Sequence, residues 1–212
     1  SGAASGAAGV DGAAGSRVSS GTAAAAAVLV LASAWYWRYD GINRYYQDYA
    51  GLGYESCEIG ETLCFGDDYI DTGLRALGYS IAAEGFDIVE YEAVAEELGY
   101  TATMIEPPER VAIVEVTLKN DGSTDPGVML PELMLHGLDF YTDMNLGLLV
   151  ELNPVLEGNY GISLPDNSEC RLTLPYNLRE SQLSKSAWSG LDELSVLLQV
   201  TAYPTTKEIV LQ

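Results

Sequence analysis

The sequence predicts a mainly β protein, an antiparallel β-sandwich preceded by one N-terminal hydrophobic, transmembrane-type helix. Short alternating segments separated by turns follow from about residue 58 onward, without the rhythm of strands and long helices that indicates a parallel sheet. An apolar run without charge, Val18–Trp37, precedes them. The predicted organisation is a Gly/Ala/Ser-rich tail at 1–17, the helix at 18–37, a juxtamembrane helix or linker at 38–57 and the sandwich at 58–212.

The N-terminal segment has the length and the flanking residues of a membrane anchor. The tail gains too little from burial to offset its ordering entropy, so we expect it to be flexible. As a helix, Val18–Trp37 spans about 30 Å, the thickness of the hydrocarbon core of a bilayer. Its C-terminal end carries the residues typical of the membrane–water interface, namely Trp35, Tyr36, Trp37 and Arg38. These features predict a single-pass protein of the cell membrane that contacts the lipid bilayer through Val18–Trp37, with its C-terminal domain outside the cytoplasm.

Two alternatives to an anchor stay open. Ala32-Ser33-Ala34 has the small-residue pattern of a signal-peptidase site. The run is also rich in alanine, which makes its insertion energy marginal. It is therefore compatible with an apolar segment that packs into neighbouring subunits of a surface filament.

The strongest strand pattern is Arg110–Asn120, in which Val114, Val116 and Leu118 alternate with polar residues. The turn sequence Asn120-Asp121-Gly122-Ser123 follows it. Further strands are predicted at 79–89, with Ile81, Phe86 and Ile88 pointing inward, and at 169–176, 194–203 and 206–211.

Other segments connect these strands. Pro204-Thr205 predicts a hairpin between the last two strands. Residues 92–98 predict a helical turn, and the segment around Trp188 a short helical crossover in which the indole plugs the sandwich. Pro131 predicts an edge or a bulge in the second apolar run.

The order VAIVEVTLKNDGS, LPDNSECRLTLPYNL and LLQVTAYPTTKEIVL resembles a family of uncharacterised extracytoplasmic immunoglobulin-like domains. They occur in membrane proteins and lipoproteins of Gram-positive bacteria and look related to the mycobacterial secreted immunoprotective antigen fold. The resemblance covers residues 58–212 and implies an immunoglobulin-like sandwich outside the cytoplasm. The chain departs from the lipoprotein members because no cysteine follows its apolar run, which favours a protein anchor.

The charge balance restricts the partners. There are 31 acidic and 10 basic residues, a net charge of −21. Such a chain repels nucleic acid, which excludes it as a partner, and attracts cations and basic proteins. The cluster Asp67-Asp68-Tyr69-Ile70-Asp71 predicts at most weak Ca²⁺ binding, because it lacks EF-hand spacing and so acidic a chain contains such clusters without any metal.

The cysteines and the single histidine argue against a catalytic or metal site. Cys57 and Cys64 enclose a short loop and form a possible disulfide outside the cytoplasm; Cys170 is then a free thiol or takes one of them as partner. No CxxC motif occurs and His136 is the only histidine, so we expect no metal site. A strand histidine without a nucleophile elbow does not indicate a hydrolase, and we expect no catalytic residue and no cofactor.

Together these observations predict a non-enzymatic, membrane-anchored extracytoplasmic interaction module that binds protein partners in the cell envelope, for instance as an accessory subunit of an envelope or transport complex. The alternative is a structural subunit of a surface filament packed through its apolar N-terminal segment. A sandwich with a ligand or catalytic site in its loops is the third option, since this fold supports many unrelated roles.

Overall fold

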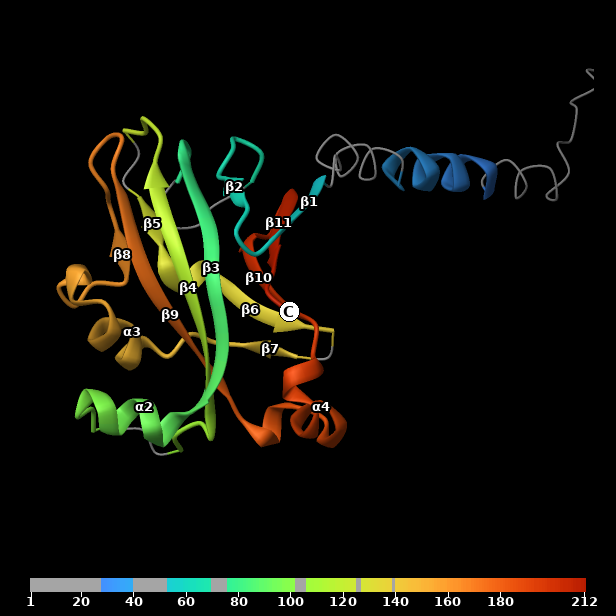
Figure 1. Ribbon diagram of the computed structural model, residues 1–212. Coiled ribbons are helices and arrows are strands. Elements are labelled where there is room, and N and C mark those ends of the chain that lie inside the picture. The colour runs from blue at the N-terminus through green and yellow to red at the C-terminus, as the bar shows by residue number, and fades with distance from the viewer. Residues whose placement is uncertain (1–27, 40–52, 70–75, 102–105, 125–126, 139) are drawn as a thin grey trace, which may run out of the picture. The chain divides into compact units, whose positions relative to one another are not determined.

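The computed structural model describes residues 28–39, 53–69, 76–101, 106–124, 127–138 and 140–212 (Figure 1). By its internal contacts the chain divides into two units, residues 1–48 and 49–212. The described part of the first unit is a helix at residues 28–39. The second unit is mainly β.

The second unit contains two larger sheets and one small one. The five-stranded sheet has the order β1-β11-β10-β6-β7, the four-stranded sheet the order β2-β3-β4-β9, and β5 pairs with β8. The strands are β1 (Gly53–Glu58), β2 (Thr62–Cys64), β3 (Tyr79–Glu90), β4 (Arg110–Asn120), β5 (Val128–Met129), β6 (Met134–Gly137), β7 (Tyr141–Thr142), β8 (Gly161–Ile162), β9 (Glu169–Leu178), β10 (Val196–Thr201) and β11 (Thr205–Val210). The two larger sheets contribute to one hydrophobic core. The sequence predicts fewer strands, about seven, because β2, β5, β7 and β8 are too short to give a pattern.

The four-stranded sheet follows the predicted alternation. In β4, Val114, Val116 and Leu118 are buried, whereas Glu115 and Lys119 are exposed. The predicted strands at 79–89 and 169–176 correspond to β3 and β9, which pair with β4 on its two sides. The register between β3 and β4 shifts between Ala83 and Gly85. This bulge at Glu84 restores the inward direction of the residues that follow it, and Phe86 and Ile88 pack against the core as predicted.

The five-stranded sheet corrects one prediction. β10 and β11 form the predicted antiparallel hairpin. However, β1 pairs with β11 in parallel, from Gly53 opposite Thr205 to Glu58 opposite Val210. The prediction of a purely antiparallel sandwich was therefore wrong at this edge. Parallel neighbours need a long connection, and here almost the whole unit lies between the two strands. The sheet also begins at Gly53, inside the segment that the sequence assigns to a linker.

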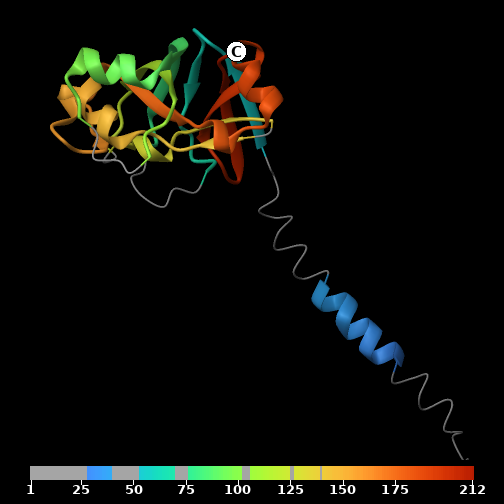
Figure 2. The same cartoon turned by 90° about the horizontal axis from the view of Figure 1, so that it is seen from below.

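Helices cover part of one sheet and one corner of the unit. They are α2 (Tyr91–Leu98), α3 (Leu146–Leu152) and α4 (Lys185–Ser189), with 3-10 turns η1 (Leu130–Glu132), η2 (Pro154–Leu156), η3 (Glu180–Gln182) and η4 (Leu191–Glu193). α2 and α3 lie side by side and enclose a second small cluster with β4, formed by Tyr91, Val111 and Leu148 (Figures 1 and 2). α2 confirms the predicted helical turn at 92–98. Pro131 lies in η1, so the proline starts a helical turn instead of marking an edge or a bulge.

Trp188 lies in α4, where the sequence predicts a short helical crossover. Its side chain is half-buried and packs against the core, with the Arg110 guanidinium 5.5 Å from the ring centroid. The indole thus closes one corner of the unit, much as predicted.

The helix at residues 28–39 overlaps the predicted membrane span. Residues 18–27 of that prediction lie outside the described residues. Among the helices that the structure does describe, none combines the length and the apolarity that crossing a bilayer requires. The membrane span at Val18–Trp37 stays a prediction.

Candidate interaction surface

Four side chains from four strands meet on the five-stranded sheet. The Glu208 carboxylate accepts a hydrogen bond from the Tyr54 hydroxyl at 2.9 Å, and its other oxygen lies 2.9 Å from His136 Nε2. The His136 ring stacks on Tyr141, with ring centroids 5.2 Å apart. These contacts place Tyr54, His136, Tyr141 and Glu208 on the same face of the sheet.

This face points away from the core. Residues directly opposite one another on paired strands share a face, so the register adds Ser56, Gln199, Met134 and Leu197 to the same side. Their neighbours along the strands, Leu135, Leu198 and Ile209, are fully buried on the other side. The same register also places Glu58, Thr206 and Val210 on this side. We call the outer set the aromatic face; it comprises Tyr54, Ser56, Glu58, Met134, His136, Tyr141, Leu197, Gln199, Thr206, Glu208 and Val210.

The aromatic face differs from the rest of this chain in charge and in exposure. Tyr54 and Tyr141 are 64% and 63% exposed, and Met134 is exposed as well. Two carboxylates lie on this face: Glu58, which is exposed at the end of β1, and Glu208, whose side chain is 9% exposed and paired with His136. In a chain with a net charge of −21 this surface therefore carries little negative charge. Exposed tyrosine and methionine with few charges are the composition of the central part of protein–protein interfaces.

The polar contacts of Glu208 hold the Tyr54 and His136 side chains in place, and their arrangement is not that of a catalytic relay. Tyr54 and His136 bind the same carboxylate, so the histidine does not stand between the acid and a nucleophile, as it does in a Ser-His-Asp triad. The hydrogen bond to Glu208 raises the pKa of Tyr54, with smaller contributions from burial and from the carboxylate charge. A tyrosine with a raised pKa is a poorer proton donor and a poorer nucleophile. The arrangement orders the tyrosine against the sheet.

The predicted interface group is located in the first unit. Trp35, Tyr36, Trp37 and Arg38 lie in the helix at residues 28–39, where the three aromatic side chains are all exposed. Trp35 stacks on Tyr39 with ring centroids 5.3 Å apart. Exposed aromatic rings at one end of a helix are compatible with the predicted interfacial role.

The three cysteines are free thiols in this structure. Cys57 lies in β1, Cys64 in β2 and Cys170 in β9. Burial raises the pKa of Cys57, helped by the charges of Glu61, Glu55 and Glu58, and burial also raises the pKa of Cys170. The disulfide between Cys57 and Cys64 stays a prediction.

The acidic cluster proposed for Ca²⁺ lies partly outside the described residues, since residues 70 and 71 are not described. Asp68 is bound instead to a cation of the protein itself: its Oδ2 lies 3.2 Å from the Nζ atom of Lys207. Within the part of the chain that the structure describes, no group of three or more metal-ligating side chains is close enough to hold an ion.

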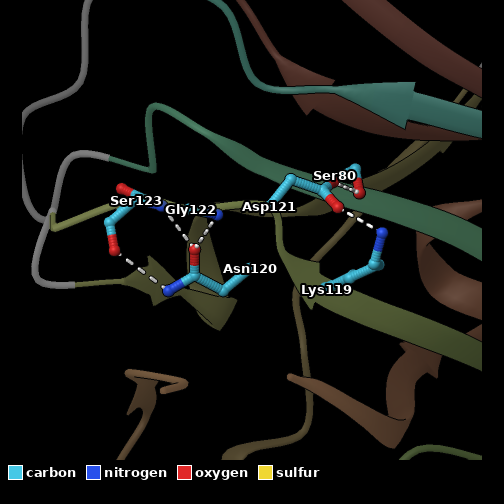
Figure 3. A network of polar contacts seen from close by, with 6 residues as sticks. All are labelled: Ser80, Lys119, Asn120, Asp121, Gly122 and Ser123. Carbon is cyan, nitrogen blue, oxygen red and sulfur yellow. Dashed lines mark hydrogen bonds and ion pairs between the residues drawn. The ribbon is translucent and has the colours of Figure 1, made fainter. Parts of the chain in front are cut away.

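A second polar network holds the turn after β4 (Figure 3). The Asn120 side chain is almost fully buried, and its Oδ1 accepts hydrogen bonds from the main-chain N–H groups of Gly122 and Ser123 at 3.0 and 2.6 Å. Its Nδ2 donates to the carbonyl groups of Ser123 and Leu164 at 3.1 and 2.9 Å. Gly122 has a φ of 106°, which glycine adopts without strain. The structure thus contains the predicted turn, and the Asn120 side chain within it connects β4 to the 164–168 loop.

This structure defines a two-sheet, mainly β domain that exposes an aromatic face. Residues 54–207 match a family model described as "Domain of unknown function (DUF5028)", and the chain belongs to that family. The match runs from β1 into the first half of β11 and contains most of the aromatic face, but it ends one residue before Glu208. It confirms the prediction of an uncharacterised domain family. No curated protein and no solved structure matches the chain.

Sequence reasoning did not find the aromatic face. Its residues come from five strands in three separate parts of the chain, and β1, β6 and β7 are short or polar. The parallel pairing that brings Tyr54 beside Glu208 leaves no local signal. The one available signal was the alternation of Met134 and His136 with the buried residues Leu135 and Gly137 in β6.

Proposed function

We propose that this protein is a non-enzymatic, extracytoplasmic interaction module, an immunoglobulin-like domain of Gram-positive type that is tethered to the cell membrane through its N-terminal segment. Its protein partner in the cell envelope docks on the aromatic face. The observation that carries the proposal is the exposed, charge-poor aromatic surface in a chain of net charge −21. Two negatively charged proteins approach each other at least cost where local charge is low.

The chemistry of the face also defines the kind of partner. Tyrosine and methionine supply flat apolar contact area, whereas the fixed Tyr54 hydroxyl and the His136 ring supply directional polar groups. A partner that fits has a surface of apolar side chains with a few hydrogen-bonding groups. The immunoglobulin-like assignment and the tether rest on the sequence resemblance and on the Val18–Trp37 run.

Site-specific photo-crosslinking tests the docking surface. A photoreactive phenylalanine analogue replaces Tyr141 in the full chain, expressed in its native membrane. The matched control places the same group at Tyr160, which is also an exposed tyrosine but lies outside the aromatic face. We expect a discrete heteromeric product from position 141, absent from position 160 and lost when Met134→Glu is added.

Three outcomes would overturn the proposal. Equal crosslinking from both positions would show that the face has no special role. A product that consists only of this chain, in a regular ladder, would favour the filament subunit instead. Turnover of any member of a hydrolase substrate panel by the purified protein would contradict a non-enzymatic module.

A further inference from the structure

A groove runs along the outer face of the four-stranded sheet, on the side of the unit that lies away from the aromatic face. It consists of two adjoining hollows of about 520 and 410 Å³, which share Glu115, Leu152 and Thr173 in their walls. Each hollow lies within the size range of ligand pockets in proteins. The end of α3 and the turn η2 form one wall, and β3, β4 and β9 form the floor.

The groove combines apolar contact area with negative charge. Leu152 and Val155 line the larger hollow, together with the acidic residues Glu84 and Glu115 and one basic residue, Arg171. The smaller hollow adds the carboxylates of Asp87 and Glu97. Among the described residues, none of these four carboxylates takes part in an ion pair. Glu84 lies in the bulge between Ala83 and Gly85, next to the position opposite Glu115, and both residues line the larger hollow.

The main chain of β9 borders the same groove. β9 is the last strand in the order of the four-stranded sheet, so one of its edges faces away from β4. Most of that edge is closed by the protein itself. Asn153 imitates a neighbouring strand, because its side chain accepts from the Thr173 N–H and donates to the Thr173 carbonyl, both at 2.7 Å. Further along, Asn145 donates to the Pro175 carbonyl, and Asn177 donates to Asp143.

The closure stops at Thr173. Main-chain groups alternate in direction along a strand, so the N–H and carbonyl of Arg171 point outward like those of Thr173. Within the described residues, no group accepts from the Arg171 N–H, and its carbonyl receives only the Cys170 thiol at 3.5 Å. Arg171 therefore presents an unpaired strand edge at the wall of the larger hollow.

We infer that this groove is a second binding site, which takes an extended peptide segment bearing lysine or arginine from a protein partner. The peptide adds a short strand to β9 at Arg171, in the mode of strand addition to a sheet edge. One basic side chain lies between Glu84 and Glu115, and the next side chain on that face lies against Leu152 and Val155. The negative charge of the whole chain attracts a cationic peptide toward the groove. The inference does not depend on the aromatic face, which lies on the other sheet.

The charge part of the inference is tested by fluorescence anisotropy with a labelled octapeptide of alternating lysine and valine, added to the full chain. The double variant Glu84→Gln with Glu115→Gln removes two exposed carboxylates of the groove. The matched control, Glu96→Gln with Glu193→Gln, removes two exposed carboxylates elsewhere. Two exposed ion pairs are worth about a three- to tenfold change in Kd, so we expect that loss from the groove variant and less than about twofold from the control. Equal losses would show that the peptide senses only the net charge and would overturn the site.

The strand-addition part is tested at Arg171. Arg171→Pro removes the outward N–H, whereas Arg171→Ala removes the same side chain and keeps that N–H. Proline is tolerated at outward positions of edge strands, and Pro175 already occupies one in β9. We expect the proline variant to bind the octapeptide about tenfold more weakly than the alanine variant. Equal binding by the two variants would contradict strand addition.

A second measurement covers the case in which Arg171→Pro does not fold, as judged by circular dichroism. Two versions of the octapeptide then carry N-methyl groups on alternate residues, one at the odd positions and the other at the even positions, and the unmodified chain is titrated with each. We expect one version to give no anisotropy change and the other to bind, since only one edge of an added strand faces β9. Equal binding of both N-methylated peptides would overturn the inference.

Discussion

At the scale of single residues, buried asparagine side chains replace main-chain partners that the strands do not provide. The Asn120 side chain makes four hydrogen bonds, three within the turn after β4 and one to the Leu164 carbonyl, and Asn153 closes the edge of β9. A buried side chain that satisfies main-chain groups on two segments fixes their relative position. Its loss costs the desolvation of every group left unpaired.

Replacing Asn120 with alanine removes the acceptor of two main-chain N–H groups and the amide that donates to the Ser123 and Leu164 carbonyls. We expect the free energy of unfolding to fall by about 2–4 kcal/mol, measured by urea denaturation. Ser168→Ala is the control, because it removes one hydrogen bond at an exposed turn; there the loss stays below about 1 kcal/mol. Equal losses in the two variants would contradict the role assigned to Asn120.

Asp121 gives the stability of the domain a specific dependence on pH. Hydrogen bonds from Lys119 and from Ser80 lower the pKa of Asp121 below its ordinary value of 3.8. A carboxylate with a lowered pKa in the folded state stabilises the fold above the unfolded pKa, and this contribution disappears as the pH falls through the lowered pKa. In Asp121→Asn, the free energy of unfolding should therefore fall less steeply with decreasing pH below 3.8.

Denaturant titrations of both proteins at a series of pH values measure this slope. Because Asp121 and Lys119 are partly exposed, the difference should shrink in high salt, where exposed charges are screened. Identical slopes for the parent and the variant at low salt would show that Asp121 titrates at the same pH in both states.

At the scale of secondary-structure elements, Lys207 holds the strands at one edge of the domain together. It lies on the inward side of β11 and is 4% exposed. Its Nζ donates to the Cys64 carbonyl in β2 at 2.8 Å and lies 3.4 Å from the Glu55 carboxylate in β1. One ammonium group thus links strands of both larger sheets.

Lys207→Met keeps the length of the side chain and removes its charge. We expect the free energy of unfolding to fall by about 1–3 kcal/mol, mainly because the Cys64 carbonyl loses a charged donor in a buried place; Glu55 and Asp68 are partly exposed and keep contact with water. The control is Lys185→Met, at an exposed lysine in α4. A loss no larger than that of the control would refute the linking role.

The elements also show how far sequence reasoning reaches. The β4 strand and the hairpin of β10 and β11 are predicted because their apolar residues alternate and their turn residues are typical. The bulge at Glu84 explains why the alternation in 79–89 is only partial. The polar strand β1 is mostly exposed and carries no apolar pattern, so it reads as a linker. The position at which the edge of β9 is left unpaired depends on the Asn153 side chain, which closes the edge at Thr173 and borders the groove. A single sequence does not distinguish this asparagine from any other asparagine in a loop.

At the scale of the whole molecule, acidic charge is spread over a domain that has a charge-poor face and a negative groove on its two outer sheet surfaces. Because the two sheets share one core, these surfaces point away from each other, so the two proposed binding sites do not overlap. Repulsion among like charges lowers the stability of the compact state.

Raising the NaCl concentration from near zero to about 0.3 M screens this repulsion and should raise the Tm by roughly 2–5 °C. Differential scanning calorimetry measures the shift. A triple variant, Glu92→Gln with Glu157→Gln and Glu193→Gln, carries three exposed charges fewer and should show a smaller rise. A Tm that falls with salt would mean that attractive charge pairs dominate the electrostatics of the fold.

The parallel pairing of β1 with β11 has a mechanical consequence. Any force transmitted through the residues before Gly53 first reaches β1, an edge strand held by one row of hydrogen bonds over Gly53–Glu58 and by the Lys207 contact. A pull along the strand axis loads all of those bonds together in shear, whereas a pull across it opens them one after another. The domain therefore resists tension along β1 and yields to tension across it, and the separation of β1 would remove Tyr54 from the aromatic face before the core opens.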